Sequence, residues 1–218
     1  MSDVLIRDIE EKDLPALKTL IVEAFGDGWN LRRFDQESDV FGALLDVYLS
    51  IFLNSSTFGR VAEREGKVVG AVLASAKGDA ATFRLFQQDI APNTLALLSA
   101  SEAERTDIVT HLATSFQTIG QLLENRVEEY DGSLEFIAVS KESQGLGIGN
   151  ALWKEASVYL ESKKVKSLYL ISDSACNIGF YEHNGFSRVA SSEAVYDYTT
   201  GQKRFDIFVY EYRLREPS

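Results

Sequence analysis

The chain has 218 residues, of which 45% are hydrophobic and 25% charged, so it can bury an ordinary hydrophobic core. Its net charge of −11 argues against nucleic acid or an anionic membrane as main partner, and is compatible with a cationic substrate. The single cysteine, Cys176, excludes an internal disulfide and fits a reducing compartment. Because no signal-peptide pattern and no apolar run of transmembrane length occurs, we expect a cytoplasmic protein.

The first part of the chain predicts the element order β-α-α-β-β from its hydrophobic periodicity. The expected elements are a strand at 4–7, helices over 14–25 and 41–52, and strands at 58–63 and 67–75. Asp13 precedes the first helix as a candidate N-cap, and Pro15 falls in its first turn, where proline is tolerated. A turn around Glu65 and Gly66 joins the two strands.

Residues 77–132 predict an enlarged helical section between the third and fourth strands. Segment 82–90 is ambiguous between helix and strand, and Pro92 is expected to break it before a helical turn at 94–100. Ser101 and Glu104 have the spacing of a capping box, after which apolar residues recur along one helix face. This section has three possible roles at this point: substrate specificity, a subunit contact, or a purely structural one.

The second half contains a strand, a glycine-rich loop and a helix in immediate succession. An apolar run at 136–139 predicts a buried strand, a polar turn covers 140–143, and the loop 144–149 reads Q-G-L-G-I-G. Free backbone N–H groups and the helix dipole make such a helix start an anion site. A Walker loop is excluded because Asn150 and Ala151 stand where it needs Lys and Ser or Thr. A dinucleotide fingerprint lacks its third glycine at Asn150, although Asp173 is placed as its ribose-binding acid.

Two motifs in this half resemble the GCN5-related N-acetyltransferase (GNAT) superfamily. Gln144, Gly147 and Gly149, after a strand ending in Val139, have the pattern of its pyrophosphate loop for acetyl-CoA. The segment 180–186, F-Y-E-H-N-G-F, resembles its second signature. The resemblance implies an α/β GNAT fold, with a central mixed, mostly antiparallel sheet of about six or seven strands flanked by helices. Strands four and five are expected to splay apart, and residues 1–218 to form a single N-acetyltransferase domain with 77–132 as a helical insertion.

The resemblance also implies a reaction and its partners. We expect acetyl-CoA as co-substrate, no metal, and direct transfer of the acetyl group to a primary amine. A small cationic metabolite is the first expectation for the acceptor, on net charge alone. A protein N-terminus or lysine is the alternative acceptor, and a non-catalytic acyl-CoA-binding module is the alternative class. Neither nucleic acid nor a membrane is expected as a partner.

Candidate site residues follow from the two motifs. Tyr181 occupies the family position of the general acid that protonates the leaving thiolate, although a helix tyrosine can also simply pack on the core. Glu135 lies four residues before Val139, so a period of two places both side chains on one strand face and makes Glu135 a candidate base. A solvated strand carboxylate is the competing interpretation of Glu135. The expected acetyl-CoA contacts are Ile137, Val139, Gln144, Gly145, Leu146, Gly147, Ile148, Gly149 and Asn177.

The residues before Tyr181 depart from the commonest family pattern. Ser174 stands where that pattern has an asparagine, and Asn177 stands where it has a small residue, so either can contact the pantetheine arm. Cys176 is expected near the thioester end as a small packing residue rather than a nucleophile. His111 and His183, the two histidines of the chain, are expected to be satisfied or solvated, and no Cys/His cluster has metal-ligand spacing.

The C-terminal tail predicts a hairpin of two strands, at 189–198 and 204–212, with its turn at 199–202. Aromatic residues lie on both faces of these strands, which is typical of a strand that is buried on both sides. The same aromatic residues can form part of a substrate pocket or a homodimer contact.

Overall fold

The computed structural model describes residues 4–29, 31–83 and 90–214. The strands are β1 (Val4–Asp8), β2 (Phe58–Arg64), β3 (Lys67–Ala76), β4 (Gly132–Val139), β5 (Ser167–Asp173), β6 (Ser187–Tyr198) and β7 (Gly201–Arg213). The helices are α1 (Leu14–Phe25), α2 (Asp39–Ser55), α3 (Ile90–Ser99), α4 (Glu102–Leu123), α5 (Ile148–Ser162) and α6 (Ile178–His183). None of the helices within these described ranges combines the length and apolar character needed to span a bilayer.

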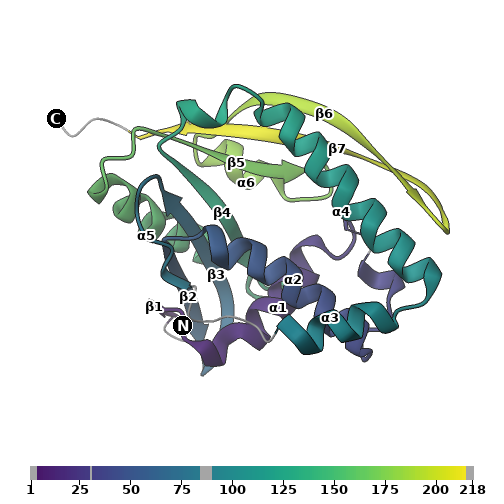
Figure 1. Cartoon of the computed structure of the whole chain (residues 1–218). Helices are drawn as coiled ribbons and strands as arrows, with labels where there is room; N and C mark the ends of the chain where they lie inside the picture. The colour runs from purple at the N-terminus through teal and green to yellow at the C-terminus, as the bar shows by residue number, and fades with distance from the viewer. Residues whose placement is uncertain (1–3, 30, 84–89, 215–218) are drawn as a thin grey trace.

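The strands form one seven-stranded sheet in the order β1-β2-β3-β4-β5-β7-β6 (Figure 1). Neighbouring strands are antiparallel except β4 and β5, which run parallel. The register of β4 with β5 covers only two pairs, Gly132 with Leu168 and Ser133 with Tyr169. The two strands therefore diverge toward their C-terminal ends, which confirms the expected splay and opens the middle of the sheet.

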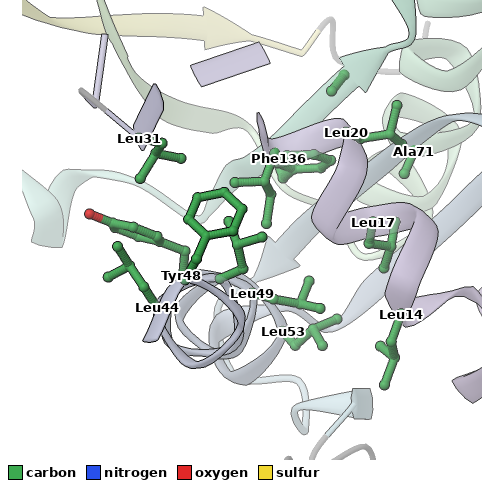
Figure 2. Packing of buried hydrophobic residues seen from close by; sticks show 14 of the residues in the cluster. Leu14, Leu17, Leu20, Leu31, Leu44, Tyr48, Leu49, Leu53, Ala71 and Phe136 are labelled. Carbon is green, nitrogen blue, oxygen red and sulfur yellow. The ribbon is translucent and has the colours of Figure 1, made fainter. Parts of the chain in front are cut away.

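Helices cover both faces of the sheet. Leucines of α1 and α2 pack on one face against β3 and β4, and Figure 2 shows Leu17, Leu49 and Phe136 in this cluster. On the opposite face, α5 buries Leu152, Ala156 and Leu160 completely. These three helices, α1, α2 and α5, bury their apolar residues against the sheet.

Two local expectations in the first half are wrong. Asp13 does not cap α1, because its buried carboxylate accepts hydrogen bonds from Arg7 at 2.7 and 2.9 Å and from the Glu10 backbone N–H at 2.9 Å. Pro92 does not break the chain before a helical turn, since α3 already begins at Ile90 and includes Pro92 in its first turn. The ambiguous segment 82–90 lies mostly outside the described residues, at 84–89.

A β-bulge interrupts the pairing of β3 with β4. Leu73 faces Phe136 and Ala74 faces Leu134, so Glu135 is an extra residue without an opposite number on β3. A bulge reverses the alternation of side chains beyond it. Residues of β4 an odd number apart can therefore lie on the same face of the sheet when Glu135 stands between them, as Leu134 and Ile137 do.

The bulge overturns the expectation that Glu135 and Val139 share one face. Phe136 and Ala138 pack in the cluster beneath α1 and α2, whereas Val139 packs against the cluster on the α5 face. The Glu135 carboxylate lies on the α1/α2 face, where Ser55 at the end of α2 contacts it. A strict period of two fails here because the extra residue shifts the pleat by one position.

Helix α4 lies across the β6/β7 end of the sheet (Figure 1). The capping box between Ser101 and Glu104 is present at its start, as the sequence predicts. One turn further on, the buried Asp107 carboxylate accepts hydrogen bonds from the N–H and hydroxyl of Thr199 at 2.7 and 2.8 Å and forms an ion pair with Arg33. Helix α4 is thus fastened both to the loop after α1 and to the turn of the β6/β7 hairpin.

Candidate acetyl-CoA and amine site

The glycine loop ends on the first turn of α5. Gly145 and Gly147 have φ values of +79° and +78°, in the left-handed region that glycine adopts without strain. Gly147 is the N-cap, and a Cβ built on it would meet no other atom within 4 Å, so it would project into open space before the helix. The free N–H groups of the first turn face the same space and carry the positive end of the helix dipole. This combination is suited to a pyrophosphate.

The edge of β4 faces the gap left by β5. The Ser140 N–H donates to the Val69 carbonyl of β3 at 2.8 Å. Because the backbone groups of successive residues in a strand point to opposite sides, those of Val139 and Ile137 point away from β3. They point toward β5, which is not paired with β4 at this height. The Gln144 side-chain amide donates to the Val139 carbonyl at 3.5 Å, which ties the loop to the strand end. The N–H groups of Ile137 and Val139 are therefore available to an extended ligand in the gap.

Helix α6 closes the other side of the glycine loop. The Phe180 ring lies over Gly149, where an added Cβ would come within 3.1 Å of the ring, so a small residue is required there. The Asn184 side chain donates to Asn150 of α5 at 3.2 Å. These contacts pack the two family-like motifs directly against each other, although 30 residues separate them in the sequence.

A cavity of about 290 Å³ lies where β4 and β5 diverge. Its walls come from α1 and the loop after it, α2, α4, β4, β5, α6, β6 and β7, and they include both candidate catalytic side chains, Tyr181 and Glu135. Asp173, the last residue of β5, and Cys176, in the loop after it, also contribute to the wall. Helix α4 covers this cavity from the side of β6. The structure thus brings the glycine loop, the unpaired edge of β4 and a partly open cavity together where β4 and β5 diverge.

Comparison with known proteins identifies this arrangement. The model of the Acetyltransferase (GNAT) family matches residues 14–186. The chain belongs to the GNAT acetyltransferase family. A comparison with curated protein sequences found no matching relative.

Solved structures share the fold at low sequence identity. The ribosomal-protein-S18-alanine N-acetyltransferase of Escherichia coli is 16% identical, with a TM-score of 0.55 over 99% of this chain and 97% of that one. An agmatine N-acetyltransferase in an apo mutant form is 13% identical, with a TM-score of 0.58 over 97% and 100%. The protein yncA of Salmonella typhimurium, solved with its cofactor acetyl-CoA, is 16% identical, with a TM-score of 0.54 over 100% and 97%.

In this GNAT chain the Tyr181 phenol lies in the cavity wall between β5 and α6. Burial raises the pKa of Tyr181 well above its ordinary value of 10, and the nearby Cys176 and Asp173 add to the rise, while the Ser172 hydroxyl lowers it. The phenol therefore keeps its proton at neutral pH. A protonated phenol can donate that proton but cannot act as a base.

The Glu135 carboxylate has a different environment from an exposed strand glutamate. Burial raises its pKa above the ordinary 4.5, against smaller lowering contributions from hydrogen bonds with Ser133 and Ser55. A carboxylate with a raised pKa is a stronger base. Glu135 is thus a half-buried carboxylate in the cavity wall, although the argument that first selected it, a shared face with Val139, was wrong.

The two residues that compete for the pantetheine contact differ in how they are engaged. The Ser174 hydroxyl accepts a hydrogen bond from the Asp206 backbone N–H at 3.1 Å, and the Ser174 N–H donates to the Asp206 carbonyl at 2.9 Å. Asn177 is exposed at the N-cap of α6, and its side chain does not cap that helix. Asn177 is therefore the better placed of the two to meet a ligand.

Cys176 and His111 both line the cavity in their neutral forms. Burial raises the pKa of Cys176 to about 12, so the thiol is not ionised at neutral pH and is a poor nucleophile. Burial lowers the pKa of His111 to about 4, and its Nδ1 pairs with the Tyr198 hydroxyl at 2.7 Å. His111 is thus a satisfied histidine, as expected. Within the described ranges, no group of three or more His, Cys, Asp or Glu side chains is placed to hold a metal ion.

The sequence alone did not identify the walls that α2, α4 and the loop after α1 contribute. Trp29, Tyr48, His111 and Ser115 line the cavity, and none of them lies in either family motif. One signal was present, since Asp107, His111 and Ser115 recur every four residues and so share one face of α4. Polar residues on an otherwise apolar helix face indicate a contact other than a plain core.

Proposed function

We propose that this GNAT chain transfers the acetyl group of acetyl-CoA to a primary amine by direct attack. The observation that carries the proposal is the alignment of three features at the splay of β4 and β5. They are the glycine loop at the start of α5, the unpaired edge of β4, and the cavity that holds Glu135 and Tyr181. When bound, acetyl-CoA would supply a thioester carbonyl for the amine to attack and a thiolate to leave.

In this proposal Glu135 prepares the acceptor. An alkylammonium has a pKa of roughly 10.4, so it must lose a proton before it can attack near neutral pH. The carboxylate of Glu135 takes that proton, directly or through one water molecule, and its raised pKa favours this step. The carboxylate also attracts the ammonium form into the cavity, which agrees with a cationic acceptor.

The opposite charge movement takes place at the end of β4 and on α6. The Val139 N–H, which points into the gap, is placed to donate to the oxygen that becomes negative during attack. As the C–S bond breaks, Tyr181 donates its proton to the leaving sulfur, and the second proton of the attacking nitrogen passes to the phenolate, directly or through water, which restores the phenol. The high pKa of the phenol ensures that the proton is present at the start of each cycle.

Acetyl-CoA should raise the melting temperature of the protein, because a ligand that binds only the native state stabilises it by mass action. NAD and ATP at equal concentration should give a smaller shift, since the loop lacks the third glycine and the Lys-Ser/Thr pair that they need. Differential scanning fluorimetry measures all three in one plate. A larger shift with NAD than with acetyl-CoA would contradict the proposal.

Gly147→Asp should weaken coenzyme A binding about tenfold or more, which corresponds to a loss of about 1.4 kcal/mol. The substitution places a carboxylate in the open space before the N-terminus of α5, where the pyrophosphate is expected. Gly147→Asn is the matched control, because it has the same shape and the same need for a positive φ without the charge. Isothermal titration measures both affinities, and equal losses in the two variants would show that charge at this site is irrelevant.

A further inference from the structure

The cavity has a continuous aromatic wall, formed by Phe25, Trp29, Tyr48, Phe52, His111 and Tyr196. Neighbouring rings in this wall are in contact. The centroid distance is 4.5 Å from Phe25 to Trp29 and also from Trp29 to Tyr48, and His111 stacks on Tyr196 at 5.0 Å. The wall combines residues from α1, α2, α4 and β6, so only the folded chain brings it together.

Two polar groups of the wall, on His111 and Tyr196, are paired with neighbouring side chains. His111 Nδ1 pairs with the Tyr198 hydroxyl at 2.7 Å, and the Tyr196 hydroxyl pairs with Ser115 Oγ at 3.1 Å. What the wall presents to the cavity is therefore mainly ring surface. Such a surface suits an apolar or aromatic body, which gains free energy when its area is removed from water.

Within the described part of the chain, the charged side chains that line the cavity are all acidic. Glu135 and Asp173 contribute carboxylates, and no lysine or arginine occurs among the described residues that line the cavity. His111 adds no positive charge at neutral pH, because burial lowers its pKa to about 4. The lining therefore favours a cation and disfavours a substrate that carries a carboxylate or phosphate.

We infer that the acceptor is a small amine with a flat apolar or aromatic body, whose amine meets Glu135 while its body packs on the aromatic wall. This inference rests on the proposed acetyl transfer and narrows its substrate. The volume of about 290 Å³ lies at the small end of ligand pockets and is shared with the thioester end of acetyl-CoA, so it suits only a small acceptor. Aromatic faces also attract the positively charged end of such a molecule.

The same geometry makes α4 a determinant of specificity. Asp107, His111 and Ser115 contact Thr199, Tyr198 and Tyr196 of the hairpin in turn, at successive turns of the helix. This ladder holds α4 over the cavity, so the section between β3 and β4 sets the size of the acceptor site. Ser115 is the position where added volume enters the cavity while the helix remains intact.

The test compares acceptors that differ in one property. Initial rates with acetyl-CoA, followed through the released thiol, give kcat/KM for four acceptors. These are 2-phenylethylamine, phenylalanine (the same ring with a carboxylate), putrescine (a second ammonium and no ring), and a tetrapeptide with N-terminal alanine. We expect kcat/KM for 2-phenylethylamine to exceed that for each of the other acceptors about tenfold or more. Phenylalanine adds a carboxylate, putrescine lacks the ring, and the tetrapeptide adds polar groups that the cavity would have to bury.

Substitutions in α4 test whether this helix limits the size of the acceptor. Ser115→Leu should lower kcat/KM for 2-phenylethylamine about tenfold or more while acetyl-CoA binding is retained. Ser115→Ala separates loss of the hydroxyl from loss of space and should have a small effect. Ala113→Leu is the matched control, because residue 113 is exposed on the same helix and does not line the cavity.

The outcomes separate the two proposals. A higher kcat/KM for putrescine or for the peptide would overturn the inference and leave acetyl transfer intact. Absence of turnover with every amine would overturn acetyl transfer, and the cavity is then tested by melting the protein with coenzyme A and 2-phenylethylamine. A shift that Ser115→Leu abolishes supports the aromatic site, and no shift overturns it.

Discussion

Tyr181→Phe should lower kcat by roughly 10² to 10⁴, the range that general acid catalysis contributes. The substitution removes one hydroxyl and keeps the ring, which packs on Phe180 and Phe186, so the fold of α6 should be unchanged. Coenzyme A affinity should stay within a few-fold, because the glycine loop is untouched. A lower kcat with unchanged cofactor binding is the pattern of an interaction made mainly in the transition state.

Tyr212→Phe is the matched control for this experiment. Tyr212 packs against Trp153 and Phe186 on the α5 face, and it does not line the cavity. The control should therefore retain wild-type kcat. Pre-steady-state kinetics must first show that chemistry limits turnover, because slow product release hides a slower chemical step. An unchanged chemical rate in Tyr181→Phe would remove the phenol from the mechanism.

Glu135→Gln should also lower kcat/KM by roughly 10² to 10⁴, because the amide cannot accept the proton of the ammonium. Burial raises the pKa of Glu135 above 4.5, so its base form is lost at a higher pH than that of an exposed glutamate. Wild-type kcat/KM should therefore fall as the pH drops through this raised pKa. The variant should lack that acidic limb, which a pH profile measures directly.

Glu155→Gln, on the exposed face of α5, removes one carboxylate far from the cavity and should leave both the rate and the profile as in wild type. The experiment also separates the two tasks proposed for Glu135. If the carboxylate only attracts the ammonium, the variant should raise KM and leave kcat unchanged. Retention of both the wild-type rate and the acidic limb would show that another group takes the proton.

The element order and the cofactor end of the site could be predicted from the sequence, because both depend on local patterns. The capping box at Ser101 and the glycines at 145 and 147 specify their backbone geometry through near neighbours alone. The same holds for the family motifs, whose residues lie close together in the chain. The splay of β4 and β5 was expected from the resemblance to the family, and the short parallel register confirms it.

The acceptor end of the site depended on tertiary structure. The bulge at Glu135 arises from how β3 pairs with β4, and no pattern within β4 itself reveals an extra residue. The engagement of Asp13 by Arg7, in place of the expected helix cap, has the same origin in contacts between separate elements. Side-chain faces and cap partners are decided by neighbours in space, which a one-dimensional period cannot show.

The sequence by itself determined the GNAT family and a glycine loop at a helix start, since glycine positions and helix starts follow from local backbone preferences. Only the tertiary structure decided what the cavity can accept. Its aromatic wall joins Trp29, Tyr48, His111 and Tyr196 from four separate segments, and α4 reaches it through contacts with the C-terminal hairpin. Hydrophobic burial brings such distant residues together without leaving a local signal, because it depends on area removed from water and not on spacing along the chain.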